Sequence, residues 1–242
     1  MLDPRFAAVD ARLEGVDRIL AVTGGKGGIG KSFVASTLAA ILGGNGRRVG
    51  LLDLDFTSPS DHVILGFETG VPSEEFGIDP HVHQGVHTMS IAHFAGDAPA
   101  PLRGDDVTNA LLELLAITNW GALDTLVIDM PPGLGDAALD TIRLLGRAEY
   151  LVVAQPSKVV LESVRRAMGL LRSIEAPMLG VVENMQRKDT AAVDAVAKAF
   201  DLPVLGRLPY DEAVEDALGD VPRLLETQPA MALRDVAQSL GL

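Results

Sequence analysis

Gly24-Gly25-Lys26-Gly27-Gly28-Ile29-Gly30-Lys31-Ser32 is the most informative stretch of this sequence, because it contains the phosphate-loop pattern G-x-x-x-x-G-K-[ST]. Glycines let backbone N–H groups curl around phosphate oxygens, Lys31 can reach the β- and γ-phosphates, and Ser32 can offer its hydroxyl to Mg²⁺. An apolar run at 19–22 precedes the loop and an apolar periodic segment at 33–42 follows it. This strand–loop–helix context favours a nucleotide site over a Gly-rich turn without a ligand.

The composition predicts one large α/β domain. The 242 residues are 48% hydrophobic but only 4% aromatic, so the core must consist of Val, Leu, Ile and Ala, as in buried parallel sheets. The formal net charge of −13 disfavours general binding to nucleic acid or to an anionic membrane. No signal peptide is visible, and no apolar run approaches the ~20 residues of a membrane span. We therefore expect a cytoplasmic protein.

Short apolar runs alternate with segments of helical periodicity along the whole chain. We expect strands at 18–23, 48–55, 86–94, 125–129, 150–154, 178–182 and 203–208, and helices at 5–13, 33–42, 105–117, 136–145, 158–174, 190–200, 211–218 and 230–240. Such alternation is typical of a mostly parallel sheet with helices on both faces. We expect a single domain over 1–242, with a loop or short helix at 56–66 and an irregular, Pro-rich insertion around 70–101.

Three acids follow predicted strands at the edge that carries the phosphate loop, where open parallel sheets bind their ligands. Phosphoryl transfer needs Mg²⁺ held by a hydroxyl and an acid, which Ser32 and Asp129 can supply. Asp55 can orient the attacking water, and Asp53 can assist through a water bound to Mg²⁺. A single acid here would more simply be a turn former, but three together indicate a hydrolytic site.

The turn 131–136 directly follows Asp129 and contains Pro132 and Gly133. Gly133 can present its N–H group to a γ-phosphate and move when that phosphate leaves, as switch segments do. The alternative is a rigid Pro-Gly turn that joins a strand to a helix.

These motifs together resemble the deviant P-loop ATPases of the MinD/ParA group. The resemblance rests on KGGIGKS with its early Lys26, LLDLD at 51–55 and VIDMPPGLGD at 127–136. Within the group the chain is most similar to the Mrp-type iron–sulfur carrier ATPases. RGDDVTNALLELL, WGALDTLVIDMPPGLGD, PMLGVVENM and LGRLPYD occur in the order typical of that family, from about residue 16 to the C-terminus.

The resemblance implies a homodimer in which two subunits enclose two ATP molecules with Mg²⁺. Lys26 would reach the partner's nucleotide, Asp55 would be the hydrolytic residue and Lys31 a second catalytic lysine. Asn184 would recognise adenine, although an isolated Asn after a strand is more often a turn residue. The implied nucleotide-binding set is Gly25, Lys26, Gly27, Gly28, Ile29, Gly30, Lys31, Ser32, Phe33, Asn184, Pro209 and Asp211; the metal set is Ser32, Asp53 and Asp129, and the switch is Pro132 with Gly133.

One departure concerns the cargo. Mrp-type carriers bind their cluster with a Cys-x-x-Cys pair after the ENM segment, whereas this chain has no cysteine. We therefore expect an ATPase that serves metalloprotein assembly, with an unidentified protein client and no cysteine-ligated cluster of its own. One alternative is a ParA/MinD-like spatial or regulatory protein, which the acidic charge and a last helix with a single Arg disfavour. A nucleotide sensor that does not hydrolyse ATP is the other, which the intact acids disfavour.

Histidines cluster in the Pro-rich stretch, at His81, His83 and His87, with His93 further along. Alternating His81 and His83 would share one face of a strand and suggest a metal site. Their spacing matches no defined site, so we do not include them among the predicted metal ligands.

Overall fold

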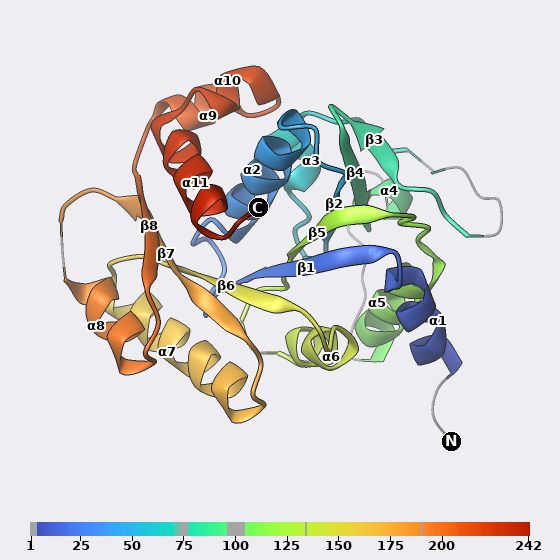
Figure 1. Ribbon diagram of the computed structural model, residues 1–242, viewed down its shortest axis with the longest axis horizontal. Coiled ribbons are helices and arrows are strands. Elements are labelled where there is room, and N and C mark those ends of the chain that lie inside the picture. Colours follow the sequence, from blue (N-terminus) through green and yellow to red (C-terminus); the bar gives the residue numbers. More distant parts are fainter. Residues whose placement is uncertain (1–3, 71, 73–76, 96–104, 134, 190) are drawn as a thin grey trace.

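The computed structural model describes residues 4–70, 72, 77–95, 105–133, 135–189 and 191–242. Within these residues an eight-stranded sheet runs in the order β3-β4-β2-β5-β1-β6-β7-β8, with helices on both sides (Figure 1). All neighbouring strands pair in parallel except β3 with β4. The predicted fold class, a mostly parallel sheet covered on both faces, is confirmed.

The strands are short and mostly buried. They are β1 (Val16–Thr23), β2 (Val49–Asp53), β3 (His81–His83), β4 (Val86–Ser90), β5 (Leu123–Asp129), β6 (Glu149–Ala154), β7 (Met178–Gln186) and β8 (Val204–Pro209). Side chains alternate across β1: Leu20 and Val22 belong to one core cluster, and Ile19 and Ala21 belong to the other. Because successive strand residues point to opposite faces, a continuous apolar run fills both cores at once.

The helices in the described part of the chain are α1 (Pro4–Leu13), α2 (Lys31–Gly44), α3 (Asp61–Leu65), α4 (Ala92–Ala95), α5 (Asp105–Ile117), α6 (Asp136–Leu144), α7 (Lys158–Ser173), α8 (Ala192–Ala199), α9 (Ala213–Ala217), α10 (Val221–Leu225) and α11 (Gln228–Ser239). Figure 1 shows α2 and α11 on one side of the sheet and α5 and α6 on the other. The last helix buries Leu233, Val236 and Ala237 in the core, as expected for a helix that docks on its own domain. No described helix has both the length and the apolar character to cross a membrane.

The strands β2 and β7 end at other residues than predicted. β2 ends at Asp53, not at Asp55, because the Asp53 carboxylate accepts the N–H of Asp55 at 3.0 Å and turns the chain out of the sheet. β7 runs on to Gln186, four residues beyond the predicted end, since the carbonyl oxygen of Gln186 accepts the N–H of Tyr210 beyond β8. The short helix α10 was not predicted.

The stretch expected to be an irregular insertion around 70–101 contains the edge of the sheet. β3 and β4 form a hairpin whose turn, Gln84-Gly85, has positive φ at both residues (47° and 81°), as a type I′ turn requires. The predicted strand 86–94 ends at Ser90 and gives way to α4. Pro99 and Pro101 in this stretch, Leu134 in the turn and Thr190 at a predicted helix start lie outside the described residues.

Candidate functional site

The phosphate loop joins β1 to α2 at the carboxyl edge of the sheet, between β5 and β6. Close packing requires glycine at some positions of the loop: a Cβ atom at Gly25 would lie 2.0 Å from the backbone of Ser163 in α7. Gly30 has a left-handed φ of 87°, and a Cβ atom there would lie 2.1 Å from Nδ2 of Asn184. Ile29 is buried and anchors the loop in the core. Glycine at these two positions thus lets the loop pack tightly against α7 and Asn184.

Ser32 and Asp129, predicted as metal ligands, lie side by side. The Ser32 hydroxyl donates a hydrogen bond of 2.5 Å to Oδ2 of Asp129. The parallel register places Asp129 at the end of β5, beside Val22 of β1 and Asp53 of β2. The second oxygen of Asp129, Oδ1, is buried and has no hydrogen-bond partner among the described residues. A hydroxyl next to an unpaired buried carboxylate oxygen is a donor set that fits Mg²⁺.

Asp53 is held by three donors. Its Oδ1 accepts the N–H of Asp55 at 3.0 Å, and its Oδ2 accepts the N–H of Ser60 at 3.2 Å and the Ser90 hydroxyl at 3.3 Å. Burial, and then the neighbouring Asp129 carboxylate, raise the pKa of Asp53 to about 8. Burial also raises the pKa of Asp129 to about 6, against the hydrogen bond from Ser32. Both acids therefore favour a proton or a cation at this position.

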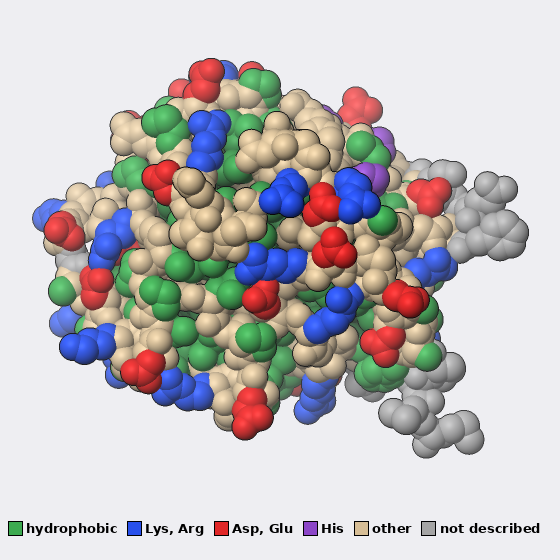
Figure 2. All heavy atoms as spheres, viewed as in Figure 1, with side chains coloured by type: hydrophobic (Ala, Val, Ile, Leu, Met, Phe, Trp, Pro, Cys, Tyr) green, Lys and Arg blue, Asp and Glu red, His purple; other side chains and the backbone are tan. Residues whose placement is uncertain are grey.

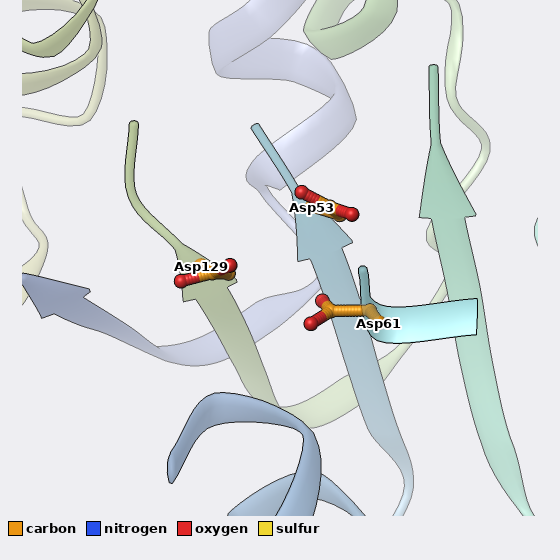
Figure 3. Close-up of side chains that lie close together, drawn as sticks. All are labelled: Asp53, Asp61 and Asp129. Carbon is orange, nitrogen blue, oxygen red and sulfur yellow. The ribbon is translucent and has the colours of Figure 1, made fainter. Parts of the chain in front are cut away.

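Asp61, which no sequence motif marks as a site residue, is a third acid of this group. It begins α3 and is 1% exposed, and its Oδ1 accepts the Ser36 hydroxyl of α2 at 2.8 Å. Carboxylate oxygens of Asp53, Asp61 and Asp129 lie within 4.8 Å of one another (Figure 3). Its sequence signal is weak: Asp61 lies two residues before the apolar run Val63-Ile64-Leu65, in a short segment after the second strand. Its burial depends on how α3 packs on α2, which local sequence does not encode.

These raised pKa values predict that the metal-free protein loses stability as the pH rises. A carboxyl group whose pKa is higher in the folded than in the unfolded chain stabilises the fold while protonated, and that contribution disappears between the unfolded pKa of about 4 and the folded pKa. We expect the free energy of unfolding, measured in urea with a chelator, to fall by on the order of 1 kcal/mol from pH 6 to pH 8. The loss should be smaller in Asp53→Asn and unchanged in Asp235→Asn, an exposed control on α11. Equal losses in all three proteins would contradict the prediction.

Asp55 lies apart from the group formed by Asp53, Asp61 and Asp129. It is half-buried and lines a cavity that the phosphate loop also lines. Its Oδ1 accepts the N–H groups of Thr57 and Ser58, each at 3.1 Å, and the Thr57 hydroxyl at 2.6 Å. The next residue, Phe56, is buried in the core and fixes this turn. Local hydrogen bonds thus hold the predicted hydrolytic carboxylate at the cavity.

The cavity has a volume of about 750 Å³, within the usual range for small-molecule sites. It extends from the phosphate loop to the segment after β8. One end is polar and carries the loop and Asp55, and the other is partly apolar. The lining residues include Gly27, Gly28, Gly30, Lys31, Ser32, Phe33, Asp55, Pro132, Asn184, Pro209, Asp211, Val214 and Leu218. A polar end for phosphates and a partly apolar end for a base suit a nucleotide.

Asn184, Pro209 and Asp211 all line this cavity. The Asn184 amide is 3% exposed and donates to the carbonyl oxygen of Ile29 at 2.9 Å, so it also supports the phosphate loop. Asp211 accepts the N–H of Ala213 at 3.0 Å and that of Gln228 at 3.1 Å, and so joins α9 to α11. Recognition of adenine by these residues stays a prediction.

Lys26 differs from Lys31 in its surroundings. Lys31 is 5% exposed and lines the cavity, whereas Lys26 is exposed, does not line it and has no side-chain partner among the described residues. A Cβ atom at Gly27 would contact Pro132 at 3.8 Å, so the loop lies against the turn predicted as a switch. Gly133 in that turn has a φ of 78°. The roles of Lys26, Pro132 and Gly133 stay predictions.

Three of the five histidines lie around Phe67. Ring centroids of His62, His83 and His93 lie 6.2, 6.0 and 5.7 Å from that of Phe67, and His81 lies 6.0 Å from His93. The described histidines do not form a group of three whose ligand atoms all lie within 4.8 Å of one another. The cluster is therefore an aromatic one in this structure.

Comparison with known proteins identifies the family of this chain. Residues 15–240 match the family model described as ParA, NUBPL iron-transfer P-loop NTPase. The iron-sulfur cluster carrier protein of Saccharolobus solfataricus is 33% identical over 226 residues, which cover 86% of this chain and 76% of that protein.

Two solved structures share the fold. A nucleotide-binding protein from Archaeoglobus fulgidus in complex with ADP is 27% identical and has a TM-score of 0.75, covering 93% of this chain and 95% of that chain. The septum site-determining protein MinD of Pyrococcus horikoshii, complexed with Mg-ADP, is 20% identical with a TM-score of 0.69, covering 92% of this chain and 95% of that chain. The resemblance to Mrp-type ATPases of the MinD/ParA group is confirmed, and the chain belongs to the ParA family of NUBPL iron-transfer P-loop NTPases.

Proposed function

We propose that this protein hydrolyses ATP with Mg²⁺, forms a homodimer when ATP is bound, and uses that cycle in the assembly of an iron–sulfur protein. The observation that carries the proposal is the pairing of Ser32 with Asp129, beside Asp53, directly behind the phosphate loop. This arrangement supplies the hydroxyl and the acid that a Mg²⁺·nucleotide complex needs.

Each residue has a proposed task in this reaction. Backbone N–H groups of the loop and Lys31 would bind the phosphates, and Ser32 with Asp129 would hold Mg²⁺, which neutralises charge on the phosphate oxygens when bound. Asp55 would orient the attacking water and accept its proton. Asn184, Pro209 and Asp211 would surround the adenine, and Pro132 with Gly133 would respond to the γ-phosphate.

The iron–sulfur part of the proposal rests on the relatives, which include proteins named iron-sulfur cluster carriers. This chain has no cysteine, so any thiolate ligands of a cluster would come from another protein. We therefore propose a cytoplasmic ATPase that energises cluster transfer by a client, without a cysteine-ligated cluster of its own.

Hydrolysis by the purified protein tests the central claim. We expect phosphate release from ATP in the presence of Mg²⁺ and a loss of about 100-fold or more when a chelator removes the cation, because the developing charge on the phosphates is then uncompensated. Restoring Mg²⁺ should restore the rate. Turnover that is independent of divalent cations would contradict the assignment of Ser32 and Asp129.

A further inference from the structure

Asp61 has no place in the phosphate-loop chemistry described above. Catalysis as proposed uses Asp129, Asp53 and Asp55, yet Asp61 is buried as deeply as Asp53, each being 1% exposed. Within the described residues no Lys or Arg forms an ion pair with Asp53, Asp61 or Asp129. Lys31 is the buried cation nearby, and its proposed partners are phosphates. The charge of Lys31 lowers the pKa of Asp129, but none of the three acids forms an ion pair among the described residues.

Two serines of α2 determine how the acids are oriented. Ser32 and Ser36 are four residues apart and therefore lie on the same face of the helix. Ser32 donates to Oδ2 of Asp129 and Ser36 donates to Oδ1 of Asp61, at 2.5 and 2.8 Å. Each serine occupies one oxygen of its acid and leaves the other free.

The free oxygens are the observation that points to a ligand. Oδ1 of Asp129 and Oδ2 of Asp61 are both buried without a hydrogen-bond partner among the described residues. Buried polar atoms without partners are rare in folded proteins and commonly mark a missing ion or water. Figure 3 shows the Asp61 carboxyl group directed toward those of Asp53 and Asp129 at the ends of β2 and β5.

The spacing suits a hard divalent cation. Oxygens on opposite sides of Mg²⁺, each at about 2.1 Å, lie about 4.2 Å apart, and around the larger Ca²⁺ the separation is about 4.8 Å. The oxygens of the three acids lie within 4.8 Å of one another. Only small movements would bring them into contact with a cation of the size of Mg²⁺ or Mn²⁺.

We propose that Asp53, Asp61 and Asp129 bind a divalent cation, Mg²⁺ or Mn²⁺, in the absence of nucleotide. Asp61 adds a third carboxylate to a region that otherwise offers two, so the cation is held by protein oxygens before ATP supplies any phosphate ligand. This inference rests on the proposed Mg²⁺-dependent function for its use, since the loaded site would be ready for ATP.

Binding of Mn²⁺ to the nucleotide-free protein tests the proposal, with the loss of the free Mn²⁺ signal in electron paramagnetic resonance as the readout. We expect the wild-type protein to bind one Mn²⁺ with a dissociation constant on the order of 100 µM or below. Mg²⁺ should displace it. Asp61→Asn should weaken the affinity by about tenfold or more, because the isosteric amide carries no charge. Asp235→Asn, which removes an exposed acid on α11 outside the cluster, is the matched control and should leave the Mn²⁺ affinity unchanged.

Thermal unfolding of the nucleotide-free protein gives a second readout. Asp61→Asn should melt at a higher temperature than the wild type without metal, because it removes one of three clustered carboxylates. Mg²⁺ should raise the melting temperature of the wild type more than that of Asp61→Asn.

Two results would overturn the inference. One is a free Mn²⁺ signal that the wild-type protein leaves unchanged at about 1 mM, which would mean that the acids retain protons. The other is equal Mn²⁺ affinity of Asp61→Asn and the wild type. ATP turnover of the same wild-type preparation with Mg²⁺ separates this inference from the proposed ATPase function. If the protein hydrolyses ATP but does not bind Mn²⁺ in the absence of nucleotide, only this inference is refuted.

Discussion

Asp55→Asn is expected to lower ATP turnover by about 100-fold or more while changing nucleotide affinity by less than about threefold. Asparagine has the size of aspartate but cannot accept the proton of the attacking water. The affinity should persist because the structure ties Asp55 to Thr57 and Ser58, not to the phosphate loop. Phosphate release and equilibrium binding of a fluorescent ATP analogue, measured with the same preparation, check the two halves of the prediction.

Thr57→Val provides the control for this experiment. It removes the 2.6 Å hydrogen bond from the Thr57 hydroxyl to Asp55 but keeps the two backbone N–H donors. We expect turnover to fall by only about threefold, the effect of loosening the carboxylate without removing it. If Asp55→Asn turned over ATP at the wild-type rate, another group would have to activate the water. If Thr57→Val were as slow as Asp55→Asn, the conformation of the turn would matter more than the carboxylate itself.

The fold was predictable because its signals are local. The apolar run that becomes β1 is buried on both faces, and the glycine loop after it needs no distant partner to be recognised. Asp53 and Asp129 come together through a general property of parallel sheets, whose strands end at the same edge. The motif and the two strand ends were therefore enough to predict that Asp129 lies beside Ser32 and Asp53 beside Asp129.

The parts that sequence did not predict depend on contacts between distant segments. Asp61 becomes a buried acid only because α3 packs against α2, 25 residues away at Ser36. Asn184 supports Ile29 across 155 residues of chain, although its residue type suggested only a base contact or a turn. The hairpin at Gln84-Gly85 lacks the Asn-Gly or Asp-Gly pair that marks such turns, so the edge strand β3 was not predicted, although a strand at 86–94 was.

Surface charge bears on which partners the proposed dimer can have. The formal net charge of the chain is −13. On the face shown in Figure 2, acidic and basic side chains are interspersed. A broad cationic face, which nucleic acid or an anionic membrane would need, is not present on that face. Two acidic chains repel each other, so a dimer needs a specific attraction at the interface. A lysine of one chain opposite the triphosphate of the ATP in the other supplies such an attraction.

Lys26→Ala is expected to abolish ATP-dependent dimerisation and to lower turnover by on the order of 100-fold or more, as loss of a cationic group supplied from a partner does in related chemistry. The exposed Lys26 side chain has no partner among the described residues and does not line the cavity of its own chain, so a second subunit's nucleotide is its natural counter-charge. Light scattering of the Asp55→Asn protein, which should retain its ATP, measures the dimer with and without Lys26→Ala. Binding of ATP to the monomer should survive, because Lys31 and the loop are untouched.

Lys198→Ala, which replaces an exposed lysine on α8, is the matched control and should dimerise normally. A Lys26→Ala protein that still dimerises with ATP would confine Lys26 to its own subunit and leave the shared active site without support.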